Sequence, residues 1–515
     1  MVRLRGSHIG TPLNPEEVEE AKIRDFVRKL ASMGYHMTPG ALRLALRLRD
    51  ARTLAELLQT RGDLPPVIDE RVLKELLEQR ERLRATEARP AQMQSVEFVT
   101  SKPKESDRSV VIEVSPKIAI RKGTPDEFVE YFQDRFLRLF ELMKKKFPNG
   151  ILTPSQLRLK GERGAHVVVA GLVAEKNSTR RGFVIVLEDL NDSVRIYIPR
   201  EAGDLYRQAE NVLLDEMVAI SGEIVDRRGS LRADGIFQPD VPRNFTPNRS
   251  NSRAKVVLIS DVHVGSSYFI EDLWKKFAQW LRSEEARDVK YLLICGDLVD
   301  GVGIYPGQED ELLIRDIYQQ YEEAARLLSM LPKDLRIVYI PGNHEPVRQA
   351  EPQPPVPEKF LKPLTQVLDH FWVGGNPSVV NIEGVRFLLY HGRSLNTIFK
   401  YVPGLQPPTG RTVVRAMTHL VMARHLAPVY GEHPIAPEPK DWLVIEEVPE
   451  VVHMGHVHVF GVGAYKNVRL INSGTFQAET PYIKKMGIAA TPGIYPIVSL
   501  HDLSVRPLNL IEEAS

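Results

Sequence analysis

The sequence has very little cysteine. Cys295 is the single cysteine among 515 residues, which excludes an intramolecular disulfide and a zinc site built from several cysteines. We therefore expect a reducing, cytoplasmic setting. Because Cys295 lies in the apolar run YLLICGD, we predict that it is a small core residue rather than a nucleophile.

Long apolar runs and an excess of one charge are also missing. No segment approaches the roughly 18 apolar residues that span a bilayer, and the first residues, MVRLRGSHIGTP, lack the apolar stretch of a signal peptide. We therefore expect no membrane association. Lys and Arg number 68 and Asp and Glu number 67, a formal net charge of +1, which excludes a chain-wide basic field for nucleic acid but not a local basic surface.

The composition is otherwise that of a folded protein with several domains. Hydrophobic residues make up 43% and charged residues 26%, which is an ordinary globular balance, and the length predicts two to four domains. The helical spacing of apolar residues predicts a small helical domain over residues 1–62. Residues 63–108 are expected to form one more helix and then a polar linker that contains proline.

Residues 109–245 are expected to form a barrel domain with a preceding strand and helix. Five short segments in this region alternate apolar and polar residues, with a helical stretch at 201–213 between the third and the fourth. This pattern predicts a closed barrel of the oligonucleotide/oligosaccharide-binding (OB) type. Such barrels bind single strands or dock proteins, and Phe183, Tyr197 and Phe237 offer only a few aromatic rings for base stacking.

From residue 253 to residue 515, apolar runs repeatedly end in polar clusters. The runs are KVVLIS–DVH, KYLLIC–GDLVD, RIVYI–PGNHE, VRFLLY–HGR and EVVHM–GHVH. Buried strands followed by polar loops are typical of a layered α/β domain, in which ligands gather at the carboxyl ends of the strands. We therefore predict an α/β domain over 253–515 with its functional site at those strand ends.

These strand ends carry side chains that ligate metals or transfer protons. In chain order they are Asp261, His263, Asp297, Asn343, His344, His391, His456 and His458. Imidazole and carboxylate together suit Mn, Fe or Zn. Two ions about 4 Å apart need an anionic bridge, and Asp297 fits this role because the glycine before it lets the backbone turn sharply. His456 and His458 lie on the same side of an extended segment, where each could serve a different ion.

The set D-x-H, G-D-x-x-D, G-N-H-E, H-G and G-H-x-H resembles the motifs of the calcineurin-like metallophosphoesterase superfamily. Longer strings, such as GDLVDGVGIYPGQEDEL and YIPGNHEPVRQAEPQP, are similar to the small subunits of archaeal family D DNA polymerases. The resemblance is strong over residues 253–515, moderate over the barrel and weak over the N-terminal helices. It implies an α/β phosphoesterase domain, a two-sheet sandwich with flanking helices, preceded by the OB-type barrel and the small helical domain.

The resemblance also implies the roles of the site residues. The ligands of one divalent ion would be Asp261, His263, Asp297 and His458, and those of the other would be Asp297, Asn343, His391 and His456. Mn²⁺ is the expected ion, with Fe²⁺, Zn²⁺ and Mg²⁺ as alternatives. His344 is not a ligand in this scheme but protonates the leaving 3′-oxygen. The implied reaction is 3′→5′ exonucleolysis at the terminal phosphodiester of DNA.

The implied partners are a large catalytic polymerase subunit and the single-stranded 3′ end of a DNA primer. A sliding clamp or a primase would be reached through the complex. The chain carries no Walker motif and no zinc-finger pattern, so synthesis would come from the partner. Two alternatives stay open: a stand-alone metallophosphatase or repair nuclease, and a non-catalytic scaffold subunit.

Several polar residues near these motifs have simpler interpretations. Glu345 stands where the superfamily usually has Asp, and we expect it to orient a neighbour rather than to bind an ion. Asp300 is expected to be structural, and the acidic run at 309–311 is expected to cap the following helix. Three arginines are candidates for phosphate contacts: Arg393, Arg415 and Arg424.

Overall fold

A computed structural model describes most of the chain. The described residues are 23, 27, 30, 36–47, 67–72, 74, 109–119, 121–226 and 228–511. They belong to two compact units, Met1–Glu97 and Phe98–Ser515. None of the described helices is long and apolar enough to cross a bilayer.

The first unit contributes helix α2 and one pair of very short strands, and residues 70–72 are also helical. Helix α2 (Pro39–Arg47) follows Thr38, whose hydroxyl accepts a hydrogen bond from the backbone amide of Ala41. Strand β1 (His36–Met37) pairs in parallel with β2 (Val67–Ile68). Most of the helical domain predicted over 1–62, and most of the helix and linker predicted over 63–108, lie outside the described residues.

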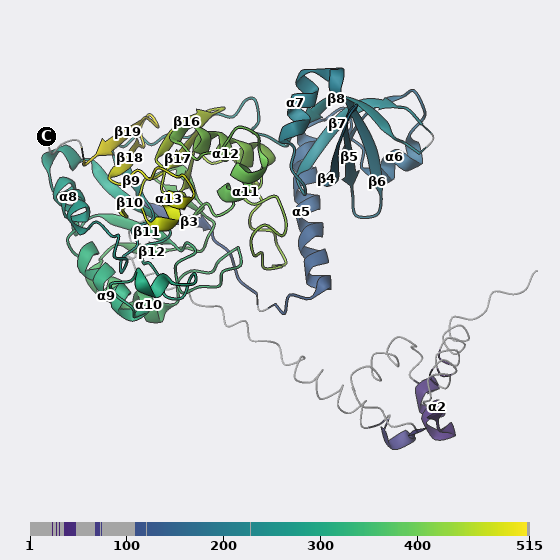
Figure 1. The fold of residues 1–515 in the computed structure, drawn as a ribbon, viewed down its shortest axis with the longest axis horizontal. Helices are drawn as coiled ribbons and strands as arrows, with labels where there is room; N and C mark the ends of the chain where they lie inside the picture. The colour runs from purple at the N-terminus through teal and green to yellow at the C-terminus, as the bar shows by residue number, and fades with distance from the viewer. Residues whose placement is uncertain are drawn as a thin grey trace, which may run out of the picture. The chain divides into compact units, whose positions relative to one another are not determined.

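Five strands of the second unit close into a barrel. They are β4 (His166–Thr179), β5 (Gly182–Glu188), β6 (Ser193–Pro199), β7 (Met217–Ile224) and β8 (Leu231–Phe237), joined in the order β4-β5-β6-β8-β7 (Figure 1). The alternation of side chains along β6 explains why a barrel forms. Val194, Ile196 and Ile198 are buried inside the barrel, while Ser193 and Arg195 are exposed. The five predicted strands are therefore confirmed, and helix α7 (Asp204–Asn211) lies between the third and the fourth.

Two helices precede the barrel, α5 (Pro125–Lys146) and α6 (Pro154–Lys160). Helix α5 begins at a capping box, in which the Thr124 side chain accepts from the Glu127 amide and Glu127 accepts from the Thr124 amide, an arrangement that satisfies donors left free by the first turn.

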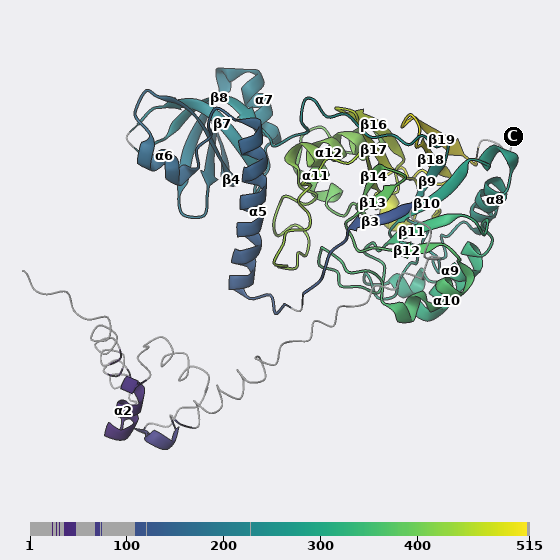
Figure 2. The ribbon, with the colours of Figure 1, turned by 180° about the vertical axis from the view of Figure 1, so that it is seen from behind.

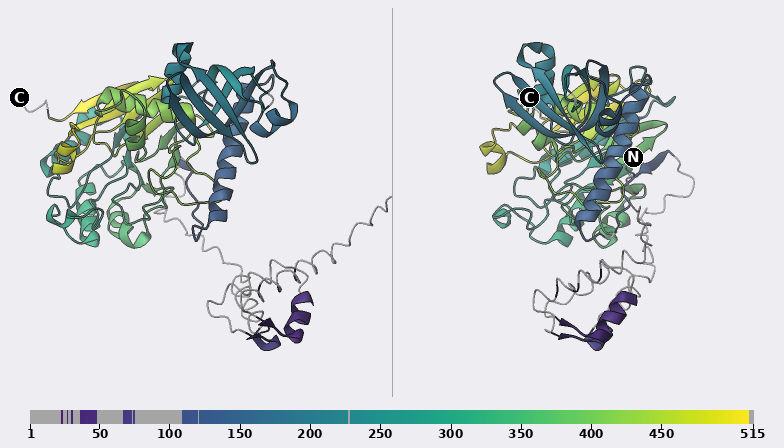
Figure 3. Two further views of the ribbon diagram at one scale, coloured as in Figure 1. Left: turned by 45° about the vertical axis from the view of Figure 1, so that its right-hand side comes forward. Right: turned by 90° about the vertical axis from the view of Figure 1, so that its right-hand side faces the viewer.

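Helix α5 lies between the barrel and the rest of the second unit. Phe140 and Met143 pack against barrel residues of β4 and β7, and Figure 3 shows this blue helix beside the barrel strands. Towards the rest of the unit, Tyr131 packs in a buried cluster with residues of the second sheet, and the buried guanidinium of Arg135 donates to the buried carboxylate of Asp441 at 2.7 Å. Helix α5 thereby contacts both the barrel and the remaining domain.

The remaining domain contains two six-stranded sheets. The first has the order β12-β11-β10-β9-β18-β19, from β9 (Lys255–Ile259), β10 (Val289–Cys295), β11 (Arg336–Ile340), β12 (Phe371–Val373), β18 (Ile494–Ser499) and β19 (Val505–Asn509). The second has the order β16-β17-β15-β14-β13-β3, from β3 (Val110–Val114), β13 (Ser378–Ile382), β14 (Val385–Leu389), β15 (Val451–Met454), β16 (Gly461–Tyr465) and β17 (Val468–Asn472). Strands β9 to β12 pair in parallel, as do β14, β15 and β17.

The two sheets pack face to face and helices cover the outside. Leu258, Leu293 and Val338 of the first sheet share a buried cluster with Phe387 and Val451 of the second. The helices are α8 (Glu271–Leu281), α9 (Ile317–Leu328) and α10 (Glu358–Val367) over the first sheet, and α11 (Leu395–Tyr401) and α12 (Gly410–Ala423) over the second, with α13 (Pro481–Lys485) near the C-terminus. The mixed sheets and flanking helices agree with the predicted α/β domain.

Strand β3 joins the second sheet rather than the barrel. It pairs antiparallel with β13, with Val110 opposite Ile382, and Figure 2 shows the two strands side by side. We grouped this strand with the barrel over 109–245 because its apolar pattern identifies a strand but not its partner. The domain boundaries remain a prediction, but the sheet takes its edge strand from before the barrel.

Two local predictions can be compared directly with the structure. Cys295 is buried at the end of β10 and burial raises the pKa of its thiol, as expected of a core residue. The prediction that residues 309–311 cap the next helix is wrong. Helix α9 begins only at Ile317, where the Asp316 carboxylate accepts from the Gln319 amide at 3.0 Å, while the acidic run lies mostly in a 3₁₀ helix at Gln308–Asp310.

Candidate metal centre

The predicted site residues come from the carboxyl ends of five parallel strands. Strands β9, β10 and β11 lie side by side in the first sheet, and β14 and β15 lie side by side in the second. The loops after them carry the predicted residues, in chain order Asp261, His263, Asp297, Asn343, His344, His391, His456 and His458. All eight are brought together, because the facing sheets place these five strand ends at one edge of the sandwich.

One group of donor atoms is formed by Asp261, His263 and His458, all buried. The Nε2 atoms of His263 and His458 face each other at 3.1 Å. The Nε2 atom of His458 also lies 3.4 Å from Oδ1 of Asp261. Three side chains from three different loops therefore point one donor atom each at the same small volume.

A second group is formed by Asp297, His391 and His456. Nε2 of His391 lies 3.1 Å from Oδ2 of Asp297 and 3.1 Å from Oδ1 of Asn343. The same Oδ2 of Asp297 lies 3.9 Å from Nε2 of His263, which belongs to the first group. Asp297 thus stands between the two groups, where its predicted bridging role would place it.

Neighbouring acceptors fix which imidazole nitrogen is free. Nδ1 of His263 donates to the Asp300 carboxylate at 2.8 Å, and Nδ1 of His391 donates to the Cys295 carbonyl at 2.9 Å. A proton on Nδ1 leaves a lone pair on Nε2, and this is the usual way in which a second contact orients a metal-binding histidine. Both Nε2 atoms are directed into the donor groups.

The donor set fits divalent cations. The Nε2 atoms of His263 and His458 lie 3.1 Å apart, and at least one of them carries a lone pair. Together with the nearby buried carboxylates, these atoms offer more electron pairs than there are protons to occupy them. Within the described part of the chain, Nδ1 of His458 is a buried nitrogen without a hydrogen-bond partner, and such groups are costly unless compensated. Imidazole, carboxylate and amide ligands together suit Mn²⁺, Fe²⁺ or Zn²⁺.

The backbone of these loops is in an unusual conformation. Five predicted ligands have positive φ angles: Asp261 at 53°, His263 at 56°, Asp297 at 51°, His456 at 69° and His458 at 57°. A residue other than glycine in this region costs of order 1–3 kcal/mol, and such strain persists only where the surrounding structure enforces it. Backbone hydrogen bonds enforce it here, since the Asp261 and His263 amides donate to the carbonyls of Gly296 and Asp297 at 3.1 and 3.0 Å.

Glycines allow the loops to approach this closely. Gly296 has a φ of 86°, which confirms the sharp turn predicted before Asp297. A Cβ atom on Gly342 would lie 2.2 Å from Oδ1 of Asp297, far inside van der Waals contact. The Asn343 loop can therefore reach the Asp297 carboxylate only with glycine at position 342.

The electrostatics of the site are those of closely paired opposite charges. Burial opposes ionisation of Asp297, but His391 and His344 outweigh it and hold its pKa well below the usual range. Burial opposes the charged form of His391, and Asp297 outweighs it and raises its pKa to about 10. Burial, supported by the charge of Asp297, raises the pKa of Glu345 to about 7. These charges draw the groups together, and cations would compete with protons for the same donors.

His344 belongs to neither of the two predicted ligand sets, although with His263 and Asp300 it forms a third group of possible metal ligands. Its Nδ1 donates to the backbone carbonyl of Asp300 at 2.6 Å, and its backbone amide donates to Oδ1 of Asp297 at 3.0 Å. Its Nε2 lies 4.0 Å from Oδ2 of Asp297. The ring is therefore fixed, with Nε2 as its remaining nitrogen.

Asp300 and Asn396 contact the site histidines in ways that the sequence does not indicate. Asp300 holds His263 through its carboxylate and His344 through its carbonyl, whereas the motif alone indicated a structural residue. Asn396, in α11, contacts Nε2 of His456 through its amide nitrogen at 2.9 Å. Nothing in the surrounding string RSLNTIFK marks it, because the contact depends on how α11 packs.

Glu345 orients backbone, as its predicted role required. Its carboxylate accepts from the amides of Asp297, Leu298 and Gly342 at 3.1, 2.7 and 2.7 Å. It therefore joins the loop after β10 to the loop after β11. The longer side chain of Glu is long enough to reach both loops at once.

The three arginines named as phosphate candidates differ in what they contact. Arg424 is buried and donates to the backbone carbonyls of Ile445 and Glu446, so it is tied to the fold. Arg393 donates to the backbone carbonyl of Gln349 at 2.8 Å beside the metal centre. Arg415 is exposed on α12 and donates to the Gly404 carbonyl at 3.1 Å.

Comparison with known proteins relates this geometry to a family. Residues 254–460 match the family model of the calcineurin-like phosphoesterases. The chain is 42% identical over 389 residues to the DNA polymerase II small subunit of Methanothermobacter thermautotrophicus, covering 73% of this chain and 78% of that protein. It is 40% identical over 387 residues to the Halobacterium salinarum protein of the same name, covering 74% of each.

A third relative is longer than the matched region. The DNA polymerase II small subunit of Pyrococcus horikoshii is 39% identical over 408 residues, which cover 76% of this chain but 64% of that protein. The sequence strings, the phosphoesterase match and these identities agree. The chain belongs to the family of archaeal DNA polymerase II (family D) small subunits and carries a calcineurin-like phosphoesterase domain.

Proposed function

We propose that this chain is the proofreading subunit of a heteromeric archaeal DNA polymerase and removes nucleotides from DNA in the 3′→5′ direction. The observation that carries the proposal is the convergence of two donor groups joined by Asp297, with His344 fixed next to them. A scaffold that used ions only for stability would need the donors but not a proton-transferring histidine. We therefore prefer the enzyme to the non-catalytic alternative.

We propose two divalent ions, one in each donor group. The assigned ligands are Asp261, His263, Asp297 and His458 for the first ion and Asp297, Asn343, His391 and His456 for the second. Mn²⁺ is our first choice, with Fe²⁺, Zn²⁺ or Mg²⁺ as alternatives. When bound, such ions supply positive charge for the phosphoryl oxygens and lower the pKa of water.

His344 is proposed as the general acid. Burial disfavours its charged form, but Asp297 and Asp300 outweigh burial and raise its pKa. Because Nδ1 is committed to the Asp300 carbonyl, the proton available for transfer is the one on Nε2. A phosphodiester seated against the two donor groups would receive this proton on its leaving 3′-oxygen.

The proposed partners follow from the family. A small subunit implies a large catalytic subunit, and the substrate would be the single-stranded 3′ end of the primer, with a clamp or primase reached through the complex. We also propose that the barrel is of OB type, because its closed order and the helix between its third and fourth strands are typical of that fold.

The test uses the purified chain and a labelled primer with a mismatched 3′ end. Cleavage is followed with Mn²⁺, with Mg²⁺ and with chelator, for the wild type and for His344→Ala. We expect stepwise loss of 3′ nucleotides that requires metal and falls by about 10² or more in the variant, while calorimetry shows Mn²⁺ binding retained.

The same reactions are repeated with the large subunit added, because docking can be required for activity. Release of phosphate from a small monoester, with the DNA left intact, would favour a stand-alone phosphatase. No cleavage of DNA in either setting, with Mn²⁺ bound, would favour the scaffold.

A further inference from the structure

A cleft of about 1070 Å³ lies between the barrel, α5 and the phosphoesterase domain, away from the strand ends that form the metal centre. Its walls come from the end of α5, from α7, from β8 and the chain that follows it, and from α12. Helix α11 connects the cleft to the centre: Asn396 contacts His456, and Val402, immediately after the helix, lines the cleft. At 1.5 Å per residue this is roughly 9 Å of helix.

Positive charge is concentrated in this cleft. Of the described residues that line it, six are cationic: Lys145, Lys146, Arg243, Arg415, Arg424 and Lys466. A single carboxylate, that of Asp240, is found among these lining residues. For a chain whose formal net charge is only +1, a ratio of six to one is a strong local excess.

Most of this charge is not neutralised by the fold. Asp240 is shared, since Lys466 donates to its carboxylate and Lys146 lies 4.0 Å away. Within the described part of the chain, Lys145 and Arg243 are exposed and form no ion pair or hydrogen bond through their side chains. Burial lowers the pKa of Lys146, and although Asp240 opposes this, the charges of Lys466 and Arg243 add to the lowering. An anion in the cleft would relieve this repulsion.

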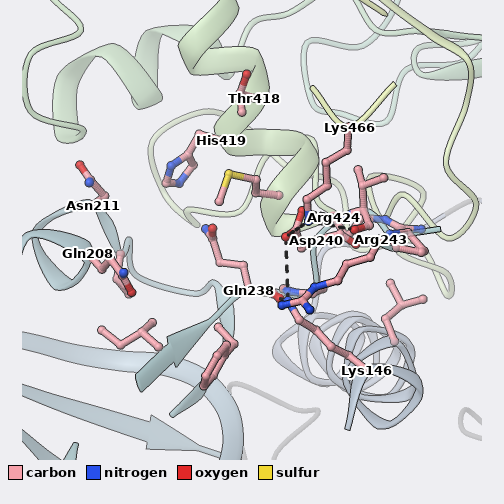
Figure 4. A pocket seen from close by; sticks show the side chains of 18 of the residues that line it. Lys146, Gln208, Asn211, Gln238, Asp240, Arg243, Thr418, His419, Arg424 and Lys466 are labelled. Carbon is pink, nitrogen blue, oxygen red and sulfur yellow. Dashed lines mark hydrogen bonds and ion pairs between the residues drawn. The ribbon is translucent and has the colours of Figure 1, made fainter. Parts of the chain in front are cut away.

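The opposite wall of the cleft is uncharged and comes from the barrel. Figure 4 shows Gln208 and Asn211 on one side and the labelled cations on the other. Phe237, at the end of β8, also lines the cleft, and 36% of its surface is exposed. Amide groups can pair with base edges and an accessible ring can stack on a base, whereas neither is needed to hold a carboxylate.

We infer that this cleft binds a segment of single-stranded nucleic acid, with its phosphates against the basic wall and its bases against Phe237 and the amides of the barrel. The two walls match the two chemically different sides of a single strand. An acidic protein segment would use the basic wall alone. The inference goes beyond the proposed hydrolysis and does not depend on it, because binding can be measured without divalent ions.

The experiment measures fluorescence anisotropy of a labelled oligothymidylate of about 12 nucleotides, with the full chain in chelator and across a range of salt. The main variant combines Lys145→Ala with Arg243→Ala. Each phosphate contact contributes about 0.7 to the slope of log K against log salt. Loss of two contacts should reduce the slope by about 1.4 and weaken binding about 25-fold near 0.1 M salt.

The matched control combines Lys276→Ala with Arg282→Ala. Both are exposed residues of α8 or its end, at the opposite end of this unit from the barrel in Figures 1 and 2. The control removes the same charges, so we expect the wild-type slope and an affinity within about twofold of it. If both double variants lose affinity equally, the binding is general electrostatics and the assignment is overturned.

The barrel wall is tested separately with Phe237→Leu, which keeps an apolar side chain but removes the ring. We expect oligothymidylate binding to weaken about fivefold or more, with the salt slope unchanged. A polyglutamate chain of matched length serves as the competing ligand. If polyglutamate binds as tightly as oligothymidylate, and Phe237→Leu has no effect on either, the occupant is an acidic protein segment and the inference is wrong.

Discussion

Replacing Asp300 with Asn tests whether the metal centre depends on a residue outside its ligand sets. The Asp300 carboxylate accepts from Nδ1 of His263 at 2.8 Å and from Nε2 of Gln308 at 3.1 Å, and both contacts are buried. Asn offers one acceptor oxygen and one NH₂ group. If the oxygen stays with His263, the NH₂ group meets the NH₂ group of Gln308, and two donors are left facing each other.

The expected size follows from these contacts. A buried donor left without an acceptor costs about 1–3 kcal/mol, and the hydrogen bond that orients His263 changes from charge-assisted to neutral. Replacing such an orienting partner lowers metal affinity by about 10–100-fold, which corresponds to about 1.4–2.8 kcal/mol. We therefore expect Asp300→Asn to bind Mn²⁺ at least about tenfold more weakly than the wild type.

Isothermal titration of Mn²⁺ into chelator-treated protein measures this change directly. The matched control is Asp310→Asn, the same substitution at an exposed position in the same loop, which should bind Mn²⁺ like the wild type. Urea unfolding of each variant shows whether the protein is still folded. A folded Asp300→Asn variant with the same affinity as Asp310→Asn would refute the argument that Asp300 orients His263.

Three further predictions concern charged pairs. Asp297→Asn should weaken both binding steps in a Mn²⁺ titration, because one carboxylate oxygen lies within 3.9 Å of a histidine in each donor group; loss of a single step would contradict the bridging role. Burial disfavours the charged form of His419, but Glu216 outweighs it and raises the pKa, so the stability from this pair is fully present below about pH 6.5 and is lost as pH rises through the raised pKa. The difference in urea midpoint between wild type and His419→Gln should therefore shrink as pH rises above about 6.5, and a constant difference would refute this. Arg135→Met leaves the Asp441 carboxylate buried without its cation and should lower the free energy of unfolding by about 3 kcal/mol or more; a loss below about 1 kcal/mol in urea unfolding would show that other groups neutralise Asp441.

The barrel strands could be predicted because the pattern that identifies a strand lies within a few consecutive residues. The strands of the barrel alternate between apolar and polar residues, as in β6, and a period of two needs no knowledge of the partner strand. The predicted site residues come together for a similar reason. Each follows a buried apolar run, and parallel strands deliver their carboxyl ends to one edge, so Asp261, Asp297 and His391 meet without any need to predict the exact packing.

The features that the sequence did not predict depend on contacts between residues far apart in the chain. Nothing near Asp300 shows that its carboxylate will meet His263, since that contact requires two neighbouring strand ends in their final register. The start of α9 was misplaced because several acidic residues precede it, and only the backbone geometry selects Asp316 as the cap. The positive φ angles of the ligands are likewise a tertiary effect, because residues such as His263 disfavour that conformation on their own.

The pairing of β3 with β13 makes α5 and the barrel an insertion within the phosphoesterase domain. The chain first forms the edge strand β3 and then the barrel. The other eleven strands of the two sheets follow from β9 onward. A protein shortened to begin at residue 253 would therefore expose the unpaired backbone edge of β13, which could then pair with strands of other chains. The barrel is also tethered at both of its ends, which restricts its orientation far more than a single linker would. Because Val110 must find Ile382, this sheet edge is closed by one of the most distant contacts in the chain, and such contacts form late in folding.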